Sequence, residues 1–214
     1  MSRGICVLAS GGFDSCVLLG ELLRRGQRVF PLYVRCGYSW EDAELHWLRR
    51  YLKALPRRCR EPLVVAEAPM RPLLRSHWSL DRRRVPAADA AWETIYLPGR
   101  NLVLLSLAGI YCAQKGLHRI AIGSLKGNPF PDATPAFIRS MSRVMGRALG
   151  RAVEVRAPYR RLSKRAVLHR GRDLPLRLSF SCLNPKGLAH CGVCSKCGER
   201  DEALEILDRL SRSA

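Results

Sequence analysis

The sequence predicts an α/β protein with a doubly wound parallel sheet of about five strands and a metal-binding segment near its C-terminus. Three observations support this prediction. Short apolar runs alternate with longer segments of helical period, a glycine-rich turn joins the first run to a helix, and four cysteines cluster near the end. Strands that alternate with helices favour a parallel sheet, whose ligands bind beyond the carboxyl ends of the strands.

The order of the elements follows from the apolar pattern. The predicted strands are residues 3–9, 29–34, 63–66, 119–123 and 153–155. The predicted helices are residues 14–25, 40–55, 101–115, 135–149, 163–169 and 202–210. Gly26, Pro56 and Gly116 follow the first three helices and end them. Residues 69–95 contain several prolines and the basic run 82–84, without a sustained period. They are predicted to form a loop or lid over a site.

The turn at residues 10–15 reads Ser-Gly-Gly-Phe-Asp-Ser. A glycine turn that leads a strand into a helix exposes backbone N–H groups and the positive end of the helix dipole, which suits an anion such as pyrophosphate. Gly11 and Gly12 permit positive φ and close approach of a ligand, and Ser10 and Ser15 add hydroxyl donors. The alternative interpretation is an ordinary capped turn between a strand and a helix, as in any doubly wound protein, with no role in phosphate binding.

Asp14 is the unusual member of this turn, because a carboxylate repels phosphate unless a cation lies between them. It therefore indicates either Mg²⁺ or a helix cap.

The chain is strongly basic. It has 37 Lys and Arg against 18 Asp and Glu, a net charge of +19, which should attract phosphates, nucleotides or nucleic acid. The excess is mostly arginine and is spread along the chain, a pattern that codon composition can also produce. The alternative to nucleic-acid binding is therefore a solvated basic surface that attracts small polyanionic substrates. No segment resembles a signal peptide or is long enough to span a bilayer, so we expect a soluble, cytoplasmic protein.

The nine cysteines fall into two groups. An odd number in a cytoplasmic chain argues against a disulfide framework. Five are scattered and are expected to be small core residues: Cys6, Cys16, Cys36, Cys59 and Cys112. Four are spaced C-x8-C-x2-C-x2-C: Cys182, Cys191, Cys194 and Cys197. Four thiolates at this spacing favour a closed, structural Zn²⁺ site, with an iron–sulfur cluster as the competing interpretation.

With these motifs in view, the chain resembles the 7-cyano-7-deazaguanine synthases, adenylating enzymes of the PP-loop ATP pyrophosphatase superfamily with an adenine nucleotide alpha hydrolase-like fold. The resemblance runs nearly end to end. Residues 10–15 fit the SGGxDS loop, residues 98–103 resemble the P-[AG]-R-N segment, and residues 123–137 resemble a shortened G…YPDCR-x-F stretch. Lys164 stands where the family has the lysine of L-x-K, and residues 182–200 are similar to its C…CGxCxxCxxR motif.

The resemblance implies a reaction. The carboxylate of 7-carboxy-7-deazaguanine attacks the α-phosphate of ATP, pyrophosphate leaves, ammonia replaces AMP, and a second ATP drives dehydration of the amide to the nitrile in queuosine-type biosynthesis. It also implies Mg²⁺, structural Zn²⁺ and a homodimer. The implied units are an ATP-binding domain at residues 1–175 and a zinc-binding segment with the closing helix at residues 176–214, packed on the same domain.

The site residues follow residue by residue. The catalytic candidates are Asp14, Arg100 and Lys164. The candidates for ATP binding are Leu8, Ala9, Ser10, Gly11, Gly12, Phe13, Asp14, Ser15, Arg100, Asn101 and Gly123. Those for substrate binding are Tyr38, Trp40, Pro131 and Asp132. Asp132 either reads a purine-like edge or caps the next helix.

The departures from the family pattern concentrate on the acid side. Residues 35–41 replace a Tyr-x-Gln-Arg-His-like segment, and residues 125–134 replace the usual approach to Pro-Asp and the following Cys-Arg. Activation of a carboxylate by ATP is therefore a firmer prediction than the identity of the acid.

Three alternatives stay open. A paralogue could adenylate a different carboxylate on a modified base, a nucleotide or a protein terminus. A tRNA-thiolating enzyme would need a sulfur-carrying cysteine, for which Cys36 and Cys112 are the candidates, or an iron–sulfur cluster. A zinc-stabilised nucleic-acid-binding module without activity is the third, although intact Ser10, Asp14 and Ser15 argue against it.

Overall fold

The computed structural model describes residues 4–212 and contains one parallel sheet of five strands in the order β3-β2-β1-β4-β5. The strands are β1 (Gly4–Leu8), β2 (Arg28–Arg35), β3 (Val64–Glu67), β4 (Arg119–Ala121) and β5 (Glu154–Arg156). The predicted five-stranded parallel sheet is confirmed. Residue 3, the predicted start of the first strand, and the outer ends of the two predicted units lie outside the described residues.

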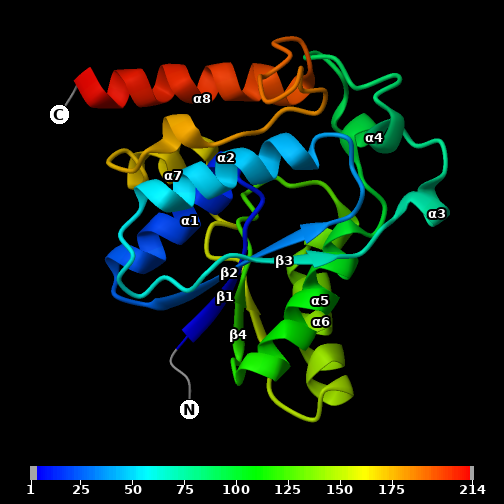
Figure 1. Ribbon diagram of the computed structural model, residues 1–214, viewed down its shortest axis with the longest axis vertical. Helices are drawn as coiled ribbons and strands as arrows, with labels where there is room; N and C mark the ends of the chain where they lie inside the picture. Colours follow the sequence, from blue (N-terminus) through cyan, green and yellow to red (C-terminus); the bar gives the residue numbers. More distant parts are fainter. Residues whose placement is uncertain (1–3, 213–214) are drawn as a thin grey trace.

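Helices cover both faces of the sheet. The six longer helices are α1 (Phe13–Arg24), α2 (Glu41–Ala54), α5 (Arg100–Lys115), α6 (Pro135–Ala148), α7 (Lys164–Arg170) and α8 (Ser195–Arg212). Figure 1 shows α1, α2 and α7 on one side of the sheet and α5 and α6 on the other. None of the helices among the described residues is long and apolar enough to cross a membrane.

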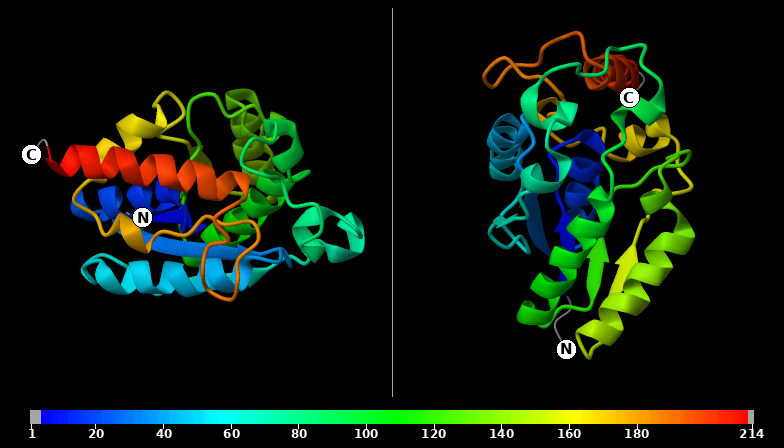
Figure 2. Two further views of the ribbon diagram at one scale, coloured as in Figure 1. Left: turned by 90° about the horizontal axis from the view of Figure 1, so that it is seen from above. Right: turned by 90° about the vertical axis from the view of Figure 1, so that its right-hand side faces the viewer.

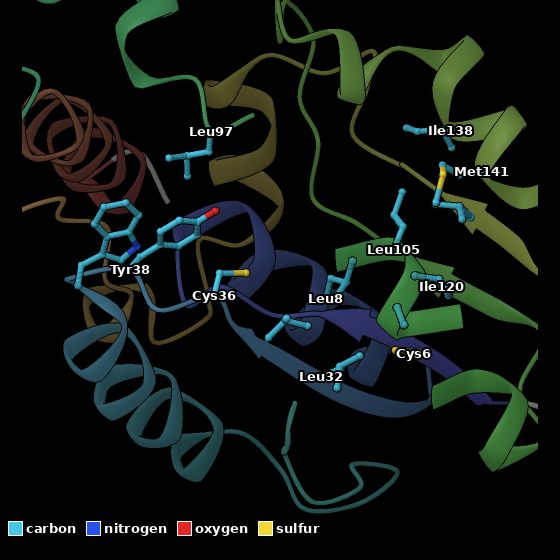
Figure 3. Packing of buried hydrophobic residues seen from close by; sticks show 14 of the residues in the cluster. Cys6, Leu8, Leu32, Cys36, Tyr38, Leu97, Leu105, Ile120, Ile138 and Met141 are labelled. Carbon is cyan, nitrogen blue, oxygen red and sulfur yellow. The ribbon is translucent and has the colours of Figure 1, made fainter. Parts of the chain in front are cut away.

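The core is divided by the sheet, as a doubly wound fold requires. Along β1, Ile5 and Val7 pack into the cluster that contains α1 and α2. Cys6 and Leu8 point to the opposite cluster, which contains α5 and α6 and is drawn in Figure 3. Because successive strand residues alternate between faces, an unbroken apolar strand marks a sheet covered on both sides.

The chain reverses direction across the sheet between β1 and β4. From β1 it proceeds to β2 and β3 on one side, and later to β4 and β5 on the other. Such a switch point leaves a crevice at the carboxyl edge, where ligands of open α/β sheets bind. The glycine turn after β1 lies at this position.

The last helix begins earlier than predicted. The sequence indicates a helix from residue 202, whereas α8 begins at Ser195 and Figure 2 shows it lying across the molecule. The apolar period is absent before Ala203, but the Cys194 carbonyl accepts hydrogen bonds from the N–H groups of Cys197 (2.9 Å) and Gly198 (3.2 Å). The cysteine segment therefore forms the first turn, which hydrophobic periodicity does not reveal.

The segment at residues 69–95 contains more regular structure than expected. It forms α3 (Arg71–Leu74), α4 (Trp78–Asp81) and the 3-10 helix η1 (Trp92–Ile95); two further 3-10 helices are η2 (Pro131–Ala133) and η3 (Leu176–Leu178). Each is too short for an apolar period to show in the sequence. The segment is attached to the start of α8, where the Ser195 N–H donates to the Pro86 carbonyl at 3.1 Å.

Candidate active site

A cavity of about 580 Å³ opens at the carboxyl edge of the sheet. Its lining comes from the glycine turn, the end of β2, the start of α2, the start of α5, parts of the loop at residues 122–128 with Phe130 and Asp132, and α8. These segments are far apart in the sequence, and the parallel sheet brings their ends to one edge. The cavity is large enough for a nucleotide and lies at the switch point.

The glycine turn forms one wall of this cavity. Gly11 has φ +80°, and a Cβ there would lie 3.3 Å from the Glu44 carbonyl oxygen, so glycine is required. Gly12 is the N-cap of α1 with φ −70°, so the expectation of positive φ at Gly12 is wrong. A Cβ on Gly12 would meet only ordinary contacts, the nearest being Ser10 Oγ at 3.6 Å. Neither the backbone nor the neighbouring protein atoms require glycine at residue 12.

The serines of the turn bond locally. Ser15 Oγ donates to the Gly12 carbonyl at 3.0 Å and lies 3.3 Å from Ser10 Oγ. Leu8, Ala9 and Phe13 are all buried core residues that line the cavity, and Phe13 is only 4% exposed. Phe13 can therefore serve a ligand mainly through its backbone.

Asp14 is paired with Lys164. The Lys164 Nζ donates to both carboxylate oxygens, at 2.7 and 2.8 Å, and both side chains are partly exposed to the cavity. Lys164 begins α7, which Ser163 caps by accepting from the Ala166 N–H. The alternative role of Asp14 as a helix cap is wrong, because Gly12 is the N-cap and α1 has no side-chain cap. The structure brings these two predicted catalytic residues together.

Arg100 lies apart from this pair, at the start of α5. Gly99, with φ +67°, precedes it, and its Nε is buried without a hydrogen-bond partner among the described residues. The guanidinium carbon lies 5.9 Å from the centre of the Tyr38 ring. Burial alone would lower the pKa of Arg100, but Glu44 and the nearby tyrosines raise it. Arg100 is thus a firmly charged cation that lines the cavity and has donors to offer.

Two buried carboxylates in the first turn of α2 were not predicted. Glu44 is 8% exposed and accepts a hydrogen bond from Tyr33 Oη at 2.8 Å. Burial raises the pKa of Glu44 to about 7, although Arg100 and the tyrosine hydroxyl oppose this. Glu41 accepts from the N–H groups of Cys36 (2.6 Å) and Gly37 (3.0 Å) and so fixes the turn after β2. In the sequence, both look like the solvated charges of an amphipathic helix.

Asp132 and Asn101 bind each other. Asp132 is buried, and its carboxylate accepts from the Asn101 N–H at 2.9 Å and from Asn101 Nδ2 at 3.4 Å. The predicted alternative that Asp132 caps the next helix is wrong, because Thr134 caps α6 by accepting from the Phe137 N–H. Asp132 instead accepts a hydrogen bond from the Asn101 N–H in the first turn of α5, 31 positions earlier in the sequence.

Pro131 and Gly123 differ in their relation to the cavity. Pro131 is exposed and is not among the lining residues. Gly123 lines the cavity, and a Cβ there would lie 3.1 Å from the Asp14 carbonyl carbon and 3.2 Å from the Ser15 nitrogen. The close packing of the end of β4 against the start of α1 is therefore enough to require glycine at residue 123, whether or not a ligand binds there.

Stacked aromatic rings form another part of the wall. Tyr38 and Trp40 stack with ring centres 5.0 Å apart, and Trp40 stacks on Trp78 of α4 at 5.6 Å. Trp40 and Trp78 line the cavity; Tyr38 does not, and its buried Oη has no hydrogen-bond partner among residues 4–212. Trp78 is contributed by the 69–95 segment, which the sequence places near the site without indicating which residue reaches it.

The four clustered cysteines fit a single metal ion. Their sulfur atoms all lie within 4.8 Å of one another, with Sγ–Sγ distances of 3.5 Å for Cys194–Cys197 and 3.8 Å for Cys191–Cys197. A tetrahedral ion with bonds of about 2.3 Å requires sulfur separations of about 3.8 Å. A four-iron cluster binds each thiolate to a separate iron atom and needs wider spacing. N–H groups of Leu183 and Cys191 also point at the sulfurs.

The other five cysteines form no disulfide in the described part of the chain. Cys6 and Cys112 are core residues with 0% exposure, as predicted, whereas the prediction is wrong for Cys59, which is only partly buried. Cys36 is 1% exposed, and burial raises the pKa of its thiol to about 11. The two candidates for a sulfur carrier, Cys36 and Cys112, are therefore both inaccessible, which disfavours the thiolating alternative.

Comparisons with known proteins agree with the geometry. The family model for "Queuosine biosynthesis protein QueC" matches residues 4–208. A 7-cyano-7-deazaguanine synthase of Hahella chejuensis is 33% identical over 97% of this chain and 90% of its own length. 7-cyano-7-deazaguanine synthase 1 of Desulfitobacterium hafniense is 29% identical over 97% of this chain and 94% of its own length.

A solved structure shares the fold. A 4-thiouridine synthetase in complex with RNA and bound ATP superposes with a TM-score of 0.53 and 17% identity, over 97% of this chain and 51% of that chain. This similarity supports the fold alone, and the predicted fold class is confirmed. Because the family model extends over nearly the whole chain and the related synthases match it end to end, the chain belongs to the QueC family of queuosine biosynthesis proteins.

Proposed function

We propose that this chain converts 7-carboxy-7-deazaguanine and ammonia into 7-cyano-7-deazaguanine, using one ATP to activate the acid and a second to dehydrate the amide, with release of AMP and pyrophosphate. The observation that carries the proposal is one cavity lined by both the glycine turn and a partly buried, charged arginine. The turn, the Asp14–Lys164 pair and Arg100 with its neighbour Glu44 all line this cavity. The names of the related synthases supply the product, 7-cyano-7-deazaguanine, and the family resemblance implies the acid as its substrate.

In the proposed mechanism, the two cations have separate tasks. The N–H groups of the glycine turn and the hydroxyls of Ser10 and Ser15 hold the phosphates that leave as pyrophosphate. Lys164 offsets the charge of Asp14 and is close enough to the turn to stabilise the α-phosphate as it is attacked. Arg100 holds the carboxylate of the acid, because a guanidinium binds a carboxylate with two parallel hydrogen bonds.

Metals enter in two ways. Mg²⁺ is brought with ATP and neutralises phosphate charge when bound. Asp14 is its nearest candidate ligand from this chain, although both carboxylate oxygens already accept from Lys164. The four cysteines would hold structural Zn²⁺, with their spacing matched to one tetrahedral ion. The homodimer implied by the family resemblance stays a prediction.

A pyrophosphate-release assay over a panel of deazapurine carboxylates, with product masses determined, tests the proposal. Pyrophosphate release that depends on 7-carboxy-7-deazaguanine, together with the nitrile mass in the presence of ammonium, is the expected result. Pyrophosphate release with another acid of the panel, and none with this one, would support the paralogue that activates a different carboxylate. Salt-dependent binding of tRNA without any turnover of ATP would contradict an enzymatic role.

A further inference from the structure

We infer that Glu44 is the ammonium site of this enzyme: its carboxylate binds the ammonium ion and takes the proton that must leave before nitrogen can attack. The inference rests on the proposed function and adds a residue that neither the sequence motifs nor the family resemblance assigned. It starts from the nucleophile. In neutral water, ammonia is present mainly as ammonium, which has four N–H donors and no lone pair, so a base has to remove one proton.

The carboxylates that line the cavity differ in what already occupies them. Both oxygens of Asp14 accept from Lys164, and both oxygens of Asp132 lie within hydrogen-bond distance of Asn101. The two oxygens of Glu41 accept from the backbone N–H groups of the turn after β2. The carboxylate oxygens of these three side chains are therefore already occupied by hydrogen bonds within the protein.

Glu44 is different. Its Oε2 accepts from Tyr33 Oη at 2.8 Å, while Oε1 has no protein hydrogen bond within the described residues. The side chain is buried yet lines the cavity, so a ligand reaches it where bulk water is largely excluded. A buried carboxylate with one uncommitted oxygen, beside the Tyr33 hydroxyl, offers the acceptors that a small cation requires.

Arg100 connects this site with the electrophile. It lines the cavity close enough to Glu44 for each to shift the pKa of the other, and it has donors for the carboxylate of the acid. The acid bound to Arg100 therefore places its carbonyl carbon next to Glu44. The positive charge of Arg100 disfavours ammonium until the acid has bound and neutralised it, so ammonium should bind after the acid.

The step balances. One proton moves from ammonium to the Glu44 carboxylate, and the freed nitrogen lone pair forms a bond to the carbonyl carbon of the acyl adenylate. The bond between that carbon and the AMP oxygen breaks, and the second proton shed by nitrogen leaves with the AMP phosphate. The products are the amide and AMP, and Glu44 returns its proton to water.

Two nucleophiles test the inference. Hydroxylamine is largely neutral at neutral pH and attacks acyl adenylates to give hydroxamates without needing prior deprotonation. In Glu44→Gln, we expect kcat/KM for ammonium to fall by about a hundredfold. Hydroxamate formation with hydroxylamine and acid-dependent ATP–pyrophosphate exchange should stay within about threefold of the wild type, because neither needs this base. Glu44→Asp should recover part of the ammonium activity.

Glu202→Gln is the matched control, since Glu202 lines the same cavity but is exposed on α8. It should leave the ammonium kinetics unchanged. Equal loss with ammonium and hydroxylamine in Glu44→Gln, or no loss with ammonium, would overturn the inference. If the wild type shows no acid-dependent ATP–pyrophosphate exchange, the proposed function fails first. If the wild type shows acid-dependent ATP–pyrophosphate exchange but Glu44→Gln affects ammonium and hydroxylamine equally, only the assignment of Glu44 as the ammonium site is wrong.

Discussion

At the scale of single residues, Asp14 and Lys164 lie 150 positions apart, yet the lysine donates to both oxygens of the aspartate. The sequence leaves two roles open for Asp14, a magnesium ligand or a helix cap. The structure removes the cap and adds a protein cation, because the start of α7 is brought against the start of α1. Asp14 is thus held in one orientation at the edge of the glycine turn.

Asp14→Asn should lower pyrophosphate release by about a hundredfold or more, because Lys164 loses the charge that orients it beside the phosphates. The free energy of unfolding should change by about 1 kcal/mol at most, since the pair is partly exposed to solvent. Steady-state kinetics and urea unfolding measure the two effects. Asp173→Asn, which removes an exposed ion-pairing aspartate far from the glycine turn in sequence, is the control. Full activity of Asp14→Asn would show that the carboxylate has no role in the reaction.

At the scale of elements, the cysteine segment joins α8 to the 69–95 segment. Cys197 lies in the first turn of α8, the Ser195 N–H donates to Pro86, and a short β-bridge pairs Ala87 with Cys194. The segment also contacts the glycine turn, because the Phe180 N–H donates to the Gly11 carbonyl at 2.8 Å. A metal held by the cysteines would therefore stabilise two walls of the cavity together.

Cys194→Ala should remove one zinc per chain and lower solubility, because the binding energy of a structural metal contributes to folding. Zinc content by atomic emission and helix content by circular dichroism measure the loss. Cys59→Ala, outside the cluster and partly exposed, should keep the metal. A colourless wild-type protein with one zinc is expected, and a brown protein absorbing visible light would contradict this assignment in favour of an iron–sulfur cluster.

At the scale of the whole molecule, the buried carboxylate of Glu44 destabilises the fold above neutral pH. Burial raises its pKa from 4.5 to about 7, so the folded state holds a proton that the unfolded chain has already lost. The contribution of Glu44 to the free energy of unfolding therefore falls as pH rises from about 4.5 to about 7, by about 3 kcal/mol in total, and stays level above that range. Retention of a group with such a cost is typical of functional sites.

Glu44→Gln should therefore be more stable than the wild type above pH 7, by about 2–3 kcal/mol, because glutamine keeps a hydrogen-bond acceptor for Tyr33 without a charge. Below about pH 4.5 the difference should fade, because the wild-type carboxyl is then largely neutral in both the folded and the unfolded protein. Thermal unfolding across this pH range measures it, and comparison of the two proteins cancels the titration of other groups. Equal stability at high pH would show that Glu44 is well solvated.

The sequence by itself determined the features that depend on local order. Apolar periodicity specifies strands and helices in alternation, the glycine turn follows from residues 10–15, and the spacing of four cysteines predicts a metal site. These are short-range patterns, in which neighbours in the chain are neighbours in space. Helix boundaries could not be predicted where the helix begins before its apolar period, as at the first turn of α8, which the cysteine segment forms.

Only the tertiary structure decided which distant groups meet. It turned Glu44 inward to Tyr33 and Arg100, paired Asp14 with Lys164, and placed Asp132 under α5 rather than at the cap of α6. The physical reason is that an amphipathic pattern does not say whether a charged side chain faces solvent or a cavity. That depends on how the helix packs, which the order of the strands and the crossover connections determine. The parallel sheet then gathers the loop ends at one edge, and the chemistry of the site depends on that meeting.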